Sequence, residues 1–539
     1  MHHRPEIATL VRALLFAALI IGQAGGSETS KLSAGEQLYR QGVLPNGTLV
    51  RGERDAATPL IGAAAACANC HRRSGLGSYE GTSVVPPIIG RYLFRGRQDN
   101  VQDMSLPHIP GYVPNRDAYT DKTLGEAIRS GLAPGGRKLS YLMPRYAFDD
   151  ETLAIMREYL KKLTADPAPG VSETHLDFAT IVTPDADPVA RDGMLQVLDQ
   201  FFSGQNQVIA AEVRPMKATR EIMYRVTRRW RLHVWTLSGA PDTWEQQLSA
   251  KMAAEPVFAA ISGIGAHTWQ PIHQFCEDHF IPCLYPNVDM PVVADQDFYT
   301  IYFTRGVFLE ADLIARALPA GGRIVLAYRS DDIGSAGARA LRERVKDGGS
   351  AFVDRPFDGG IQAAAAKLWD EIRPGDRLVL WLRNSDLAAL PERLPAGVEV
   401  YASGLMAGLE NATPPSSWRP RFHLTYPFDL PDQRRVRMNF PLGWFRVKGI
   451  PVVNERIQSD TYLACQILSE ALGHMLDSFV RDFLIERQES MLSSRLVSAY
   501  YPRLGLAPGQ RFASKGGYLV HFASPTGNQI AADTDWIVP

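Results

Sequence analysis

Apolar residues follow two different spacings along this chain of 539 residues. After residue 176, short continuous apolar runs alternate with segments in which apolar positions recur at helical spacing. The continuous runs predict buried strands, and the periodic segments predict helices. Before residue 164, periodic segments are separated by long polar loops, so we expect a mainly helical unit there.

The second stretch predicts alternating strands and helices. The strands are expected at 178–182, 257–261, 281–285, 323–328, 377–382 and 398–402. The helices are expected at 190–202, 244–254, 309–317, 336–347, 362–371 and 460–484. This alternation indicates parallel sheets with helices on both faces. Two successive blocks predict two lobes of similar build, one at about 176–300 with 430–525 and the other at about 303–430.

The first stretch predicts three helices. One begins after an N-capping Ser33 and runs to residue 41, the second covers 121–130 before Gly131, and the third covers 149–163. Residues 164–175 are rich in Pro, Gly and small polar residues, which is typical of a linker. We therefore expect one domain at 27–163 and another at 176–539.

The beginning of the chain has the pattern of an export signal. Arg4 and Arg12 precede an apolar run at 13–21, and small residues follow at 22–27. This pattern predicts a signal peptide at 1–26 and a periplasmic mature protein. The run is shorter than the roughly 20 residues that a membrane-spanning helix needs. No later stretch is long and apolar enough, so we expect no membrane span after cleavage.

Charge and cysteine content narrow the function classes. The formal net charge is -1, which argues against a nucleic-acid-binding surface because phosphates attract an excess of positive charge. Five cysteines are too few for a disulfide scaffold in an exported chain of this length. Cys276 and Cys283 are close enough in sequence for a disulfide to be one of two open alternatives. Cys465 lies in an apolar helix and is expected to be a small buried residue.

The sharpest motif in the chain is Cys67-Ala-Asn-Cys70-His71. Two thiols at this spacing can form thioethers with the two vinyl groups of one haem, and the adjoining histidine can ligate the iron. A redox dithiol would need a βαβ context, and a zinc site would need a second Cys/His pair nearby. The motif therefore predicts one covalent haem c. The residues alone leave Met104, His108 and Met143 open as the second axial ligand.

Residues 33–163 resemble the class I cytochromes c. The resemblance rests on Gly35 and Tyr39 in the first helix, Pro87 and Gly90 in a loop, Met143-Pro144, and Tyr159-Leu160 in the last helix. It implies an all-α cytochrome c domain in which Met143 is the second axial ligand. Ligation by two histidines, through His108, stays open.

Residues 176–525 resemble type 1 periplasmic substrate-binding proteins, the class used in uptake of branched-chain amino acids. The resemblance is carried by the segments 184–193, 258–263, 281–287 and 324–334. It implies a two-lobed α/β fold with a ligand cleft where the strands end. The candidate cleft residues are Ser262, Asn287, Asp289, Arg305, Asp332, Asn384 and Ser403. The segment Pro286-Asn287-Val288-Asp289 departs from the amino-acid-binding pattern, so the ligand stays open.

These features favour an electron carrier over a catalyst. An iron with both axial positions filled has no open position for a substrate. We expect a periplasmic c-type cytochrome that exchanges single electrons with a redox partner, a dehydrogenase or an oxidase-side cytochrome. The fused domain would recognise a small molecule or dock the partner. The alternative is a ligand-binding or sensing protein of a transport system with a haem redox reporter. The reduction potential and the oligomeric state stay open.

Overall fold

The computed structural model describes residues 32–54, 58–80, 83–94, 116–164, 166–212, 228–294, 297–359, 372–475, 478–492 and 499–539. Contacts divide the chain into two compact units, Met1–Asn69 with Tyr119–Lys161, and Cys70–Ala118 with Lys162–Pro539. The predicted signal peptide, the expected helix at 362–371, Met104 and His108 lie outside the described residues. The domain boundary near residue 164 stays a prediction.

The predicted helices of the first unit are confirmed. They are α2 (Ala34–Gln41), α5 (Asp121–Ser130) and α6 (Asp150–Lys162). The Ser33 hydroxyl accepts a hydrogen bond from the Glu36 amide at 3.3 Å and caps α2. Gly131 ends α5 with a φ of 70°, a left-handed conformation that glycine adopts at little cost.

The first unit also contains short strands, so it is not purely helical. β1 (Arg51–Glu53) pairs antiparallel with β2 (Leu60–Ile61) and with β5 (Arg145–Tyr146). The prediction of an all-α unit is wrong for these residues. Strands of two or three residues are too short to show the alternation of apolar and polar positions by which a strand is predicted.

A close helix crossing organises the first unit. A Cβ atom on Gly35 of α2 would lie 2.6 Å from the Cβ atom of Tyr159 on α6. One turn further along α2, the fully buried Tyr39 packs its ring against Tyr159 with the ring centroids 5.3 Å apart. Glycine at residue 35 therefore allows the two helix backbones to approach closely.

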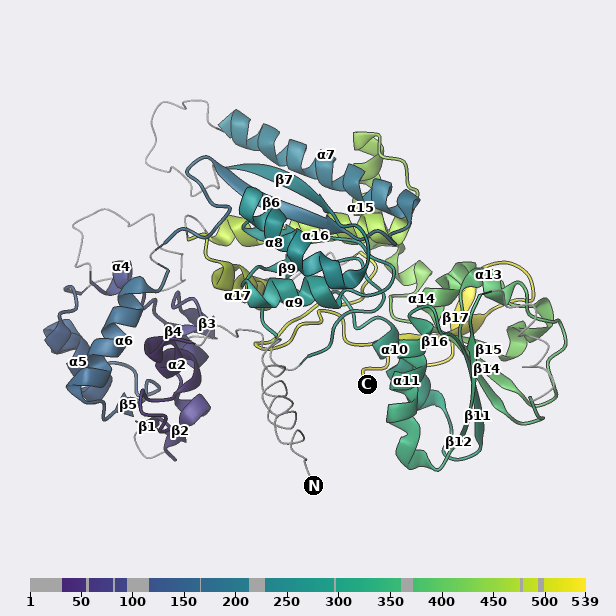
Figure 1. Ribbon diagram of the computed structural model, residues 1–539, viewed down its shortest axis with the longest axis horizontal. Helices are drawn as coiled ribbons and strands as arrows, with labels where there is room; N and C mark the ends of the chain where they lie inside the picture. The colour runs from purple at the N-terminus through teal and green to yellow at the C-terminus, as the bar shows by residue number, and fades with distance from the viewer. Residues whose placement is uncertain are drawn as a thin grey trace, which may run out of the picture. The chain divides into compact units, whose positions relative to one another are not determined.

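The first lobe of the second unit contains a parallel sheet (Figure 1). Its strand order is β10-β9-β8-β6-β7. The predicted strands at 178–182, 257–261 and 281–285 correspond to β6, β8 and β9, whereas β7 and β10 are not among the predicted strands. The elements are β6 (His175–Val182), α7 (Pro188–Glu212), β7 (Arg229–Thr236), α8 (Trp244–Ala254), β8 (Ala259–Ile261), α9 (Gln270–Asp278), β9 (Cys283–Leu284) and β10 (Thr300–Ile301).

The second lobe contains a mixed sheet with the order β12-β11-β13-β14-β15-β16-β17. β16 and β17 are antiparallel and extend this sheet, so residues 518–525 do not belong to the first lobe as the sequence predicted. The elements are α10 (Val307–Ala317), β11 (Arg323–Arg329), α11 (Gly334–Val345), β12 (Ala351–Phe357), β13 (Arg377–Trp381), α13 (Asn384–Leu387), β14 (Glu399–Ala402), α14 (Gly404–Ala407), β15 (Phe422–Tyr426), β16 (Tyr518–Phe522) and β17 (Ile530–Ala532). The two-lobed α/β architecture is confirmed.

The single helix predicted at 460–484 is wrong. The structure has α16 (Glu455–Met475) and α17 (Arg481–Met491), which follow α15 (Pro431–Lys448). Val480 precedes α17 with extended backbone, at φ -111° and ψ 132°. Apolar residues continue through the break because both helices are buried, and this continuity hides the change of direction from the sequence pattern.

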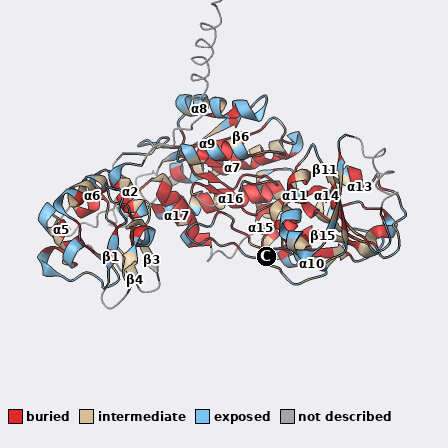
Figure 2. Cartoon of the chain, turned by 60° about the horizontal axis from the view of Figure 1, so that its bottom comes forward, coloured by how far each residue is buried: buried red, intermediate tan, exposed pale blue. Residues whose placement is uncertain are grey.

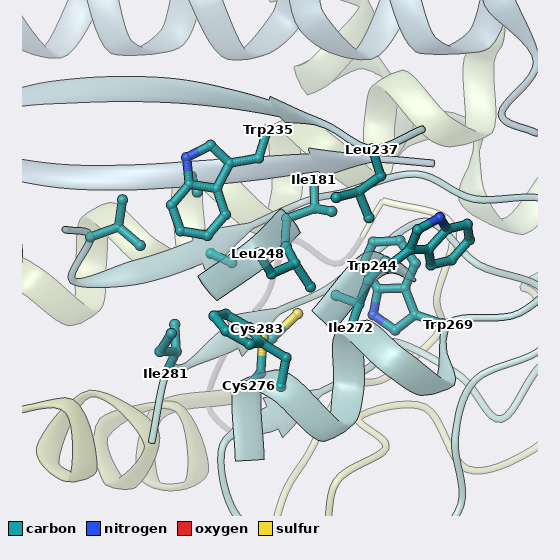
Figure 3. Close-up of a cluster of buried hydrophobic side chains, with 14 of the residues drawn as sticks. Ile181, Trp235, Leu237, Trp244, Leu248, Trp269, Ile272, Cys276, Ile281 and Cys283 are labelled. Carbon is teal, nitrogen blue, oxygen red and sulfur yellow. The ribbon is translucent and has the colours of Figure 1, made fainter. Parts of the chain in front are cut away.

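The core of the first lobe is rich in tryptophan (Figure 3). Trp235, Trp244 and Trp269 are all nearly inaccessible. Cys276 and Cys283 lie in the same cluster as thiols, and a hydrogen bond between them, together with burial, raises the pKa of Cys276 well above its usual value. The strands β6, β8 and β9 consist almost entirely of buried residues, as the colouring by burial in Figure 2 shows for β6.

Three segments connect the two lobes within the described residues, and we call them the hinge: 302–306, 427–430 and 499–517. They are tied together by backbone hydrogen bonds. The Tyr302 amide donates to the Arg511 carbonyl at 2.9 Å, and the Ala513 amide donates to the Tyr302 carbonyl at 3.0 Å. The Asp429 amide donates to the Tyr500 carbonyl at 2.8 Å. A rotation between the lobes must therefore bend all three segments together.

The crossing of α2 and α6 predicts the effect of a single methyl group. Gly35→Ala should lower the midpoint of thermal unfolding of the first unit, with a loss of about 1–3 kcal/mol because the added methyl overpacks the crossing. Calorimetry of the full chain would measure it. The control is Gly473→Ala in α16, where a Cβ atom would meet nothing within 4 Å. Equal midpoints for Gly35→Ala and the unmodified protein would contradict the close crossing.

Candidate functional site

The haem motif lies at a single helical turn. Cys67 precedes α3 (Ala68–His71), and this spacing of three residues places the two cysteines on one side of a turn. Cys67 is half-buried and Cys70 is exposed, so both sulfur atoms are accessible to a bound group. Asn69 holds the turn by donating from Nδ2 to the Ala63 carbonyl at 2.8 Å.

The His71 ring is oriented by the backbone of a neighbouring loop. Its Nδ1 lies 3.0 Å from the carbonyl oxygen of Pro86. A carbonyl only accepts, so Nδ1 carries the ring proton and Nε2 presents a lone pair. Burial lowers the pKa of His71, and the bond to Pro86 opposes this shift. Two accessible thiols and an oriented neutral imidazole fit the donor set of a haem c.

A glycine-containing hairpin positions Pro86. β3 (Ser78–Glu80) pairs with β4 (Ser83–Val85), and α4 (Gly90–Leu93) follows. The Gly77 amide donates to the His71 carbonyl at 3.2 Å. Gly77 has a φ of 79°, and a Cβ atom there would lie 2.2 Å from the Val85 carbonyl oxygen. Glycine is thus required where the hairpin returns toward the motif.

Met143 lies in the first unit, in the loop between the 3-10 turn at Pro134–Gly136 and β5. Its amide donates to the Ser140 carbonyl at 3.2 Å, and its carbonyl accepts from Arg145 Nη1 at 2.5 Å. The side chain is half-buried. Its role as an iron ligand stays a prediction.

Two of the predicted cleft residues come together at the strand ends of the first lobe. Asn287 Nδ2 donates to the Ser262 hydroxyl at 2.9 Å, and Ser262 Oγ lies 2.9 Å from Thr461 Oγ1 on α16. All three side chains are buried. Ser262 has a φ of 57°, an unfavourable conformation for a residue other than glycine. These groups satisfy one another inside the lobe.

A chain of charged side chains links the strand ends of the two lobes. Asp185 Oδ2, after β6, lies 2.8 Å from His267 Nδ1, after β8. His267 Nε2 lies 3.7 Å from Asp332 Oδ1, after β11, and Asp332 Oδ2 lies 2.6 Å from Arg383 Nε, after β13. Although desolvation opposes it, the bonds from Arg383 lower the pKa of Asp332. We call these four residues the strand-end charge chain.

The other predicted cleft residues do not converge on one site. They form separate pairs: Asp289 with Arg456 at 3.1 Å, Arg305 with Asp312 at 2.6 Å, Asn384 with the Thr413 amide at 2.7 Å, and Ser403 with Glu310. The sequence missed Asp185, His267 and Arg383 at these strand ends. Each lies in the loop that follows a strand of the sheet. A search for polar residues in these loops could have found them.

Three further side chains have the composition of a metal site. Within the described residues, His273, Glu277 and Asp297 bring their ligand atoms within 4.8 Å of one another. Glu277 already accepts from the amides of Phe298, Tyr299 and Thr300. His273 Nδ1 lies 2.9 Å from the Tyr302 hydroxyl, and its Nε2 lies 2.8 Å from Asp297. These contacts join α9 to the segment around β10, so the three side chains already have partners within the protein.

None of the helices that the structure describes combines the length and the apolar composition needed to cross a membrane.

Among known proteins, only solved structures were found to be similar to this chain. No family model matches the chain, and a search of curated proteins finds no match. A fatty acid ABC transporter substrate-binding protein from Thermomonospora curvata is similar at 13% identity and a TM-score of 0.48, covering 69% of this chain and 95% of that one. The substrate-binding protein LivJ from Streptococcus pneumoniae, solved with isoleucine, is similar at 11% identity and a TM-score of 0.48, covering 68% and 100%. The leucine-binding protein LivK from Thermotoga maritima is similar at 13% identity and a TM-score of 0.45, covering 68% of this chain and 99% of that one.

The buried Glu310 predicts a pH dependence of stability. Burial raises its pKa to about 7, although Ser403, Thr425 and the Leu405 amide donate to the carboxylate. The folded state thus binds a proton that the unfolded state has released, and stability falls as pH rises from about 4.5 to about 7. For Glu310 this loss amounts to about 3 kcal/mol. Burial raises the pKa of Asp460 and of Glu486 to about 7 as well, so the wild-type loss is the sum of several groups.

Glu310→Gln should reduce the fall in stability between pH 4.5 and 7, measured by urea unfolding at several pH values. The exposed Glu245→Gln on α8 is the control and should keep the wild-type dependence. An unchanged slope in Glu310→Gln would show that this carboxyl does not hold a proton in the folded state.

Proposed function

We propose that this protein carries one haem c and transfers single electrons in the periplasm, with its two-lobed unit as a recognition module. The orientation of His71 carries the proposal. Its Nδ1 is committed to the Pro86 carbonyl, so Nε2 is the atom available to a metal, one residue after a pair of accessible thiols. The predicted export signal at residues 1–26 supports the same assignment, because haem c is attached outside the cytoplasm.

Each residue of the motif has a defined chemical role. Cys67 and Cys70 would hold the haem covalently through their sulfur atoms. His71 would ligate the iron through Nε2, because the Pro86 carbonyl holds the ring in the tautomer that leaves this nitrogen unprotonated. A bound haem c supplies one-electron chemistry between Fe(III) and Fe(II). Met143 would offer a thioether, a soft donor that favours the ferrous state.

The second candidate is a ligand-binding or sensing protein whose haem reports its redox state. The strand-end charge chain favours it, because Asp185 and His267 of one lobe face Asp332 of the other. Such a site suits a small polar or charged molecule better than an apolar one. If this candidate holds, a charged ligand should raise the unfolding temperature of the second unit, and Asp332→Asn should reduce that increase.

Covalent attachment gives the direct test of the main proposal. The purified protein, produced in a host competent for haem attachment, should give a pyridine haemochrome spectrum of a c-type haem. Cys67→Ala should retain one thioether and shift the absorption band to longer wavelength. The double change Cys67→Ala with Cys70→Ala should lose covalent haem. Cys465→Ala, buried in α16, is the control and should keep the wild-type spectrum. Wild-type protein without covalent haem would refute the proposal.

A second measurement identifies the sixth ligand. In Met143→Ala the weak far-red band between sulfur and ferric iron should disappear, and the ferrous protein should bind carbon monoxide readily. Met156→Leu, buried in α6, is the matched control and should retain the band. If the far-red band persists in Met143→Ala, another sulfur is the ligand. If the wild type lacks the band, Met143 does not ligate the iron, and ligation by His108 is the next candidate to test.

A further inference from the structure

A buried carboxylate joins the segment after the haem motif to the hinge. Glu489 lies on α17, and its side chain is 2% exposed. One of its oxygens pairs with Arg72, the residue directly after His71. The other pairs with Arg511, in the third hinge segment, and also accepts from the Gly509 amide at 3.3 Å. Glu489 thus bonds both to the segment after the haem motif and to the hinge.

The motif side of this bridge is conformationally constrained. Arg72 has a φ of 66°, a left-handed conformation that is unfavourable for a residue other than glycine. Such a conformation persists where surrounding contacts impose it. Two residues on, the Ser74 amide and hydroxyl donate to the carboxylate of Glu486, one turn earlier on α17, with the amide at 2.9 Å. The chain after His71 is therefore fixed to α17.

The hinge side is equally constrained. The Arg511 carbonyl accepts from the Tyr302 amide, which joins the third hinge segment to the first. Arg511 Nη1 also donates to the Phe298 carbonyl at 2.9 Å. On the same ring of Phe298, the Arg73 guanidinium lies 3.8 Å from the centroid and that of Arg511 lies 5.3 Å away. Arg72 and Arg73, which follow the haem motif, thus contact Glu489 and Phe298, the two residues that also contact Arg511 in the hinge.

We propose that Glu489 is a positioning residue that couples the proximal side of the haem to the hinge between the lobes. The inference rests on the proposed attachment of haem at Cys67, Cys70 and His71. A rotation of the lobes bends the hinge segment at Arg511, and Glu489 transmits this displacement to Arg72 beside His71. Coupling between two sites is reciprocal, so the oxidation state of the iron must alter the hinge to the same extent.

Reciprocity allows a test that needs no lobe ligand. Hydrogen exchange of hinge peptides containing Tyr302, Ala513 and Ser514 is measured in the full-length holoprotein, once ferric and once ferrous. In the wild type the exchange rates should differ by about fivefold or more between the two states, the lower end of typical coupling. In Glu489→Gln the difference should disappear. The reduction potential should also rise in this variant, because losing the anion that pairs with Arg72, the residue after His71, disfavours the more positive ferric state.

The controls separate failure of this inference from failure of the proposed function. Asp177→Asn removes a carboxylate from an ion pair with Arg231 in the first lobe, and should leave the exchange difference and the potential unchanged. If Glu489→Gln does not fold, Arg72→Gln breaks the same bridge at its other end. Equal exchange in ferric and ferrous wild type, or a difference that survives both variants, overturns the coupling. Absence of covalent haem would instead refute the proposed function itself.

Discussion

The hydrogen bonds among the three hinge segments are the constraint on which the second unit depends. Each lobe has its own sheet and its own buried core, so either is complete in its packing. The lobes are joined where the Tyr302 and Ala513 backbones pair and where Asp429 bonds to Tyr500. Because these bonds join the three segments, a movement of one lobe relative to the other must bend them together.

The charged residues at the strand ends share this constraint. His267 faces Asp332 across the lobes at 3.7 Å, which is too long for a direct hydrogen bond and leaves the contact weak. The pairs within each lobe, Asp185 with His267 and Asp332 with Arg383, are much shorter. Opening the lobes therefore separates only the weakest link of the chain, and the stronger pairs keep each side charged and ordered.

The sequence predicts those features that depend on neighbours along the chain. Helix ends at Ser33 and Gly131 follow from local capping, and α8 has the bounds that its apolar spacing predicts. The break between α16 and α17 was missed because both helices are largely buried, so apolar residues continue across the break and do not mark it. β16 was assigned to the wrong lobe because strand pairing is a long-range contact, which no local pattern specifies.

The site residues also divide into those that a local pattern reveals and those that depend on long-range contacts. The motif Cys67-Ala-Asn-Cys70-His71 was found because its chemistry requires a fixed spacing. Ser262, Asn287 and Ser403 were selected because polar residues at strand ends are typical of binding sites, yet each has a buried partner far away in sequence. Polar residue type cannot distinguish a group that awaits a ligand from one that is satisfied within the protein.

Glu489 shows why the most consequential contacts escape sequence reasoning. Its partners Arg72 and Arg511 lie 417 and 22 residues away along the chain, and neither belongs to a recognisable motif. A buried carboxylate between two guanidiniums costs desolvation energy for all three groups, and a hydrophobic set of the same volume would often stabilise the fold as well. What an apolar cluster lacks is direction, because it tolerates sliding. An ion pair with two defined oxygens fixes the loop after His71 and the hinge at Arg511 to one another, so that a displacement of either is passed to the other.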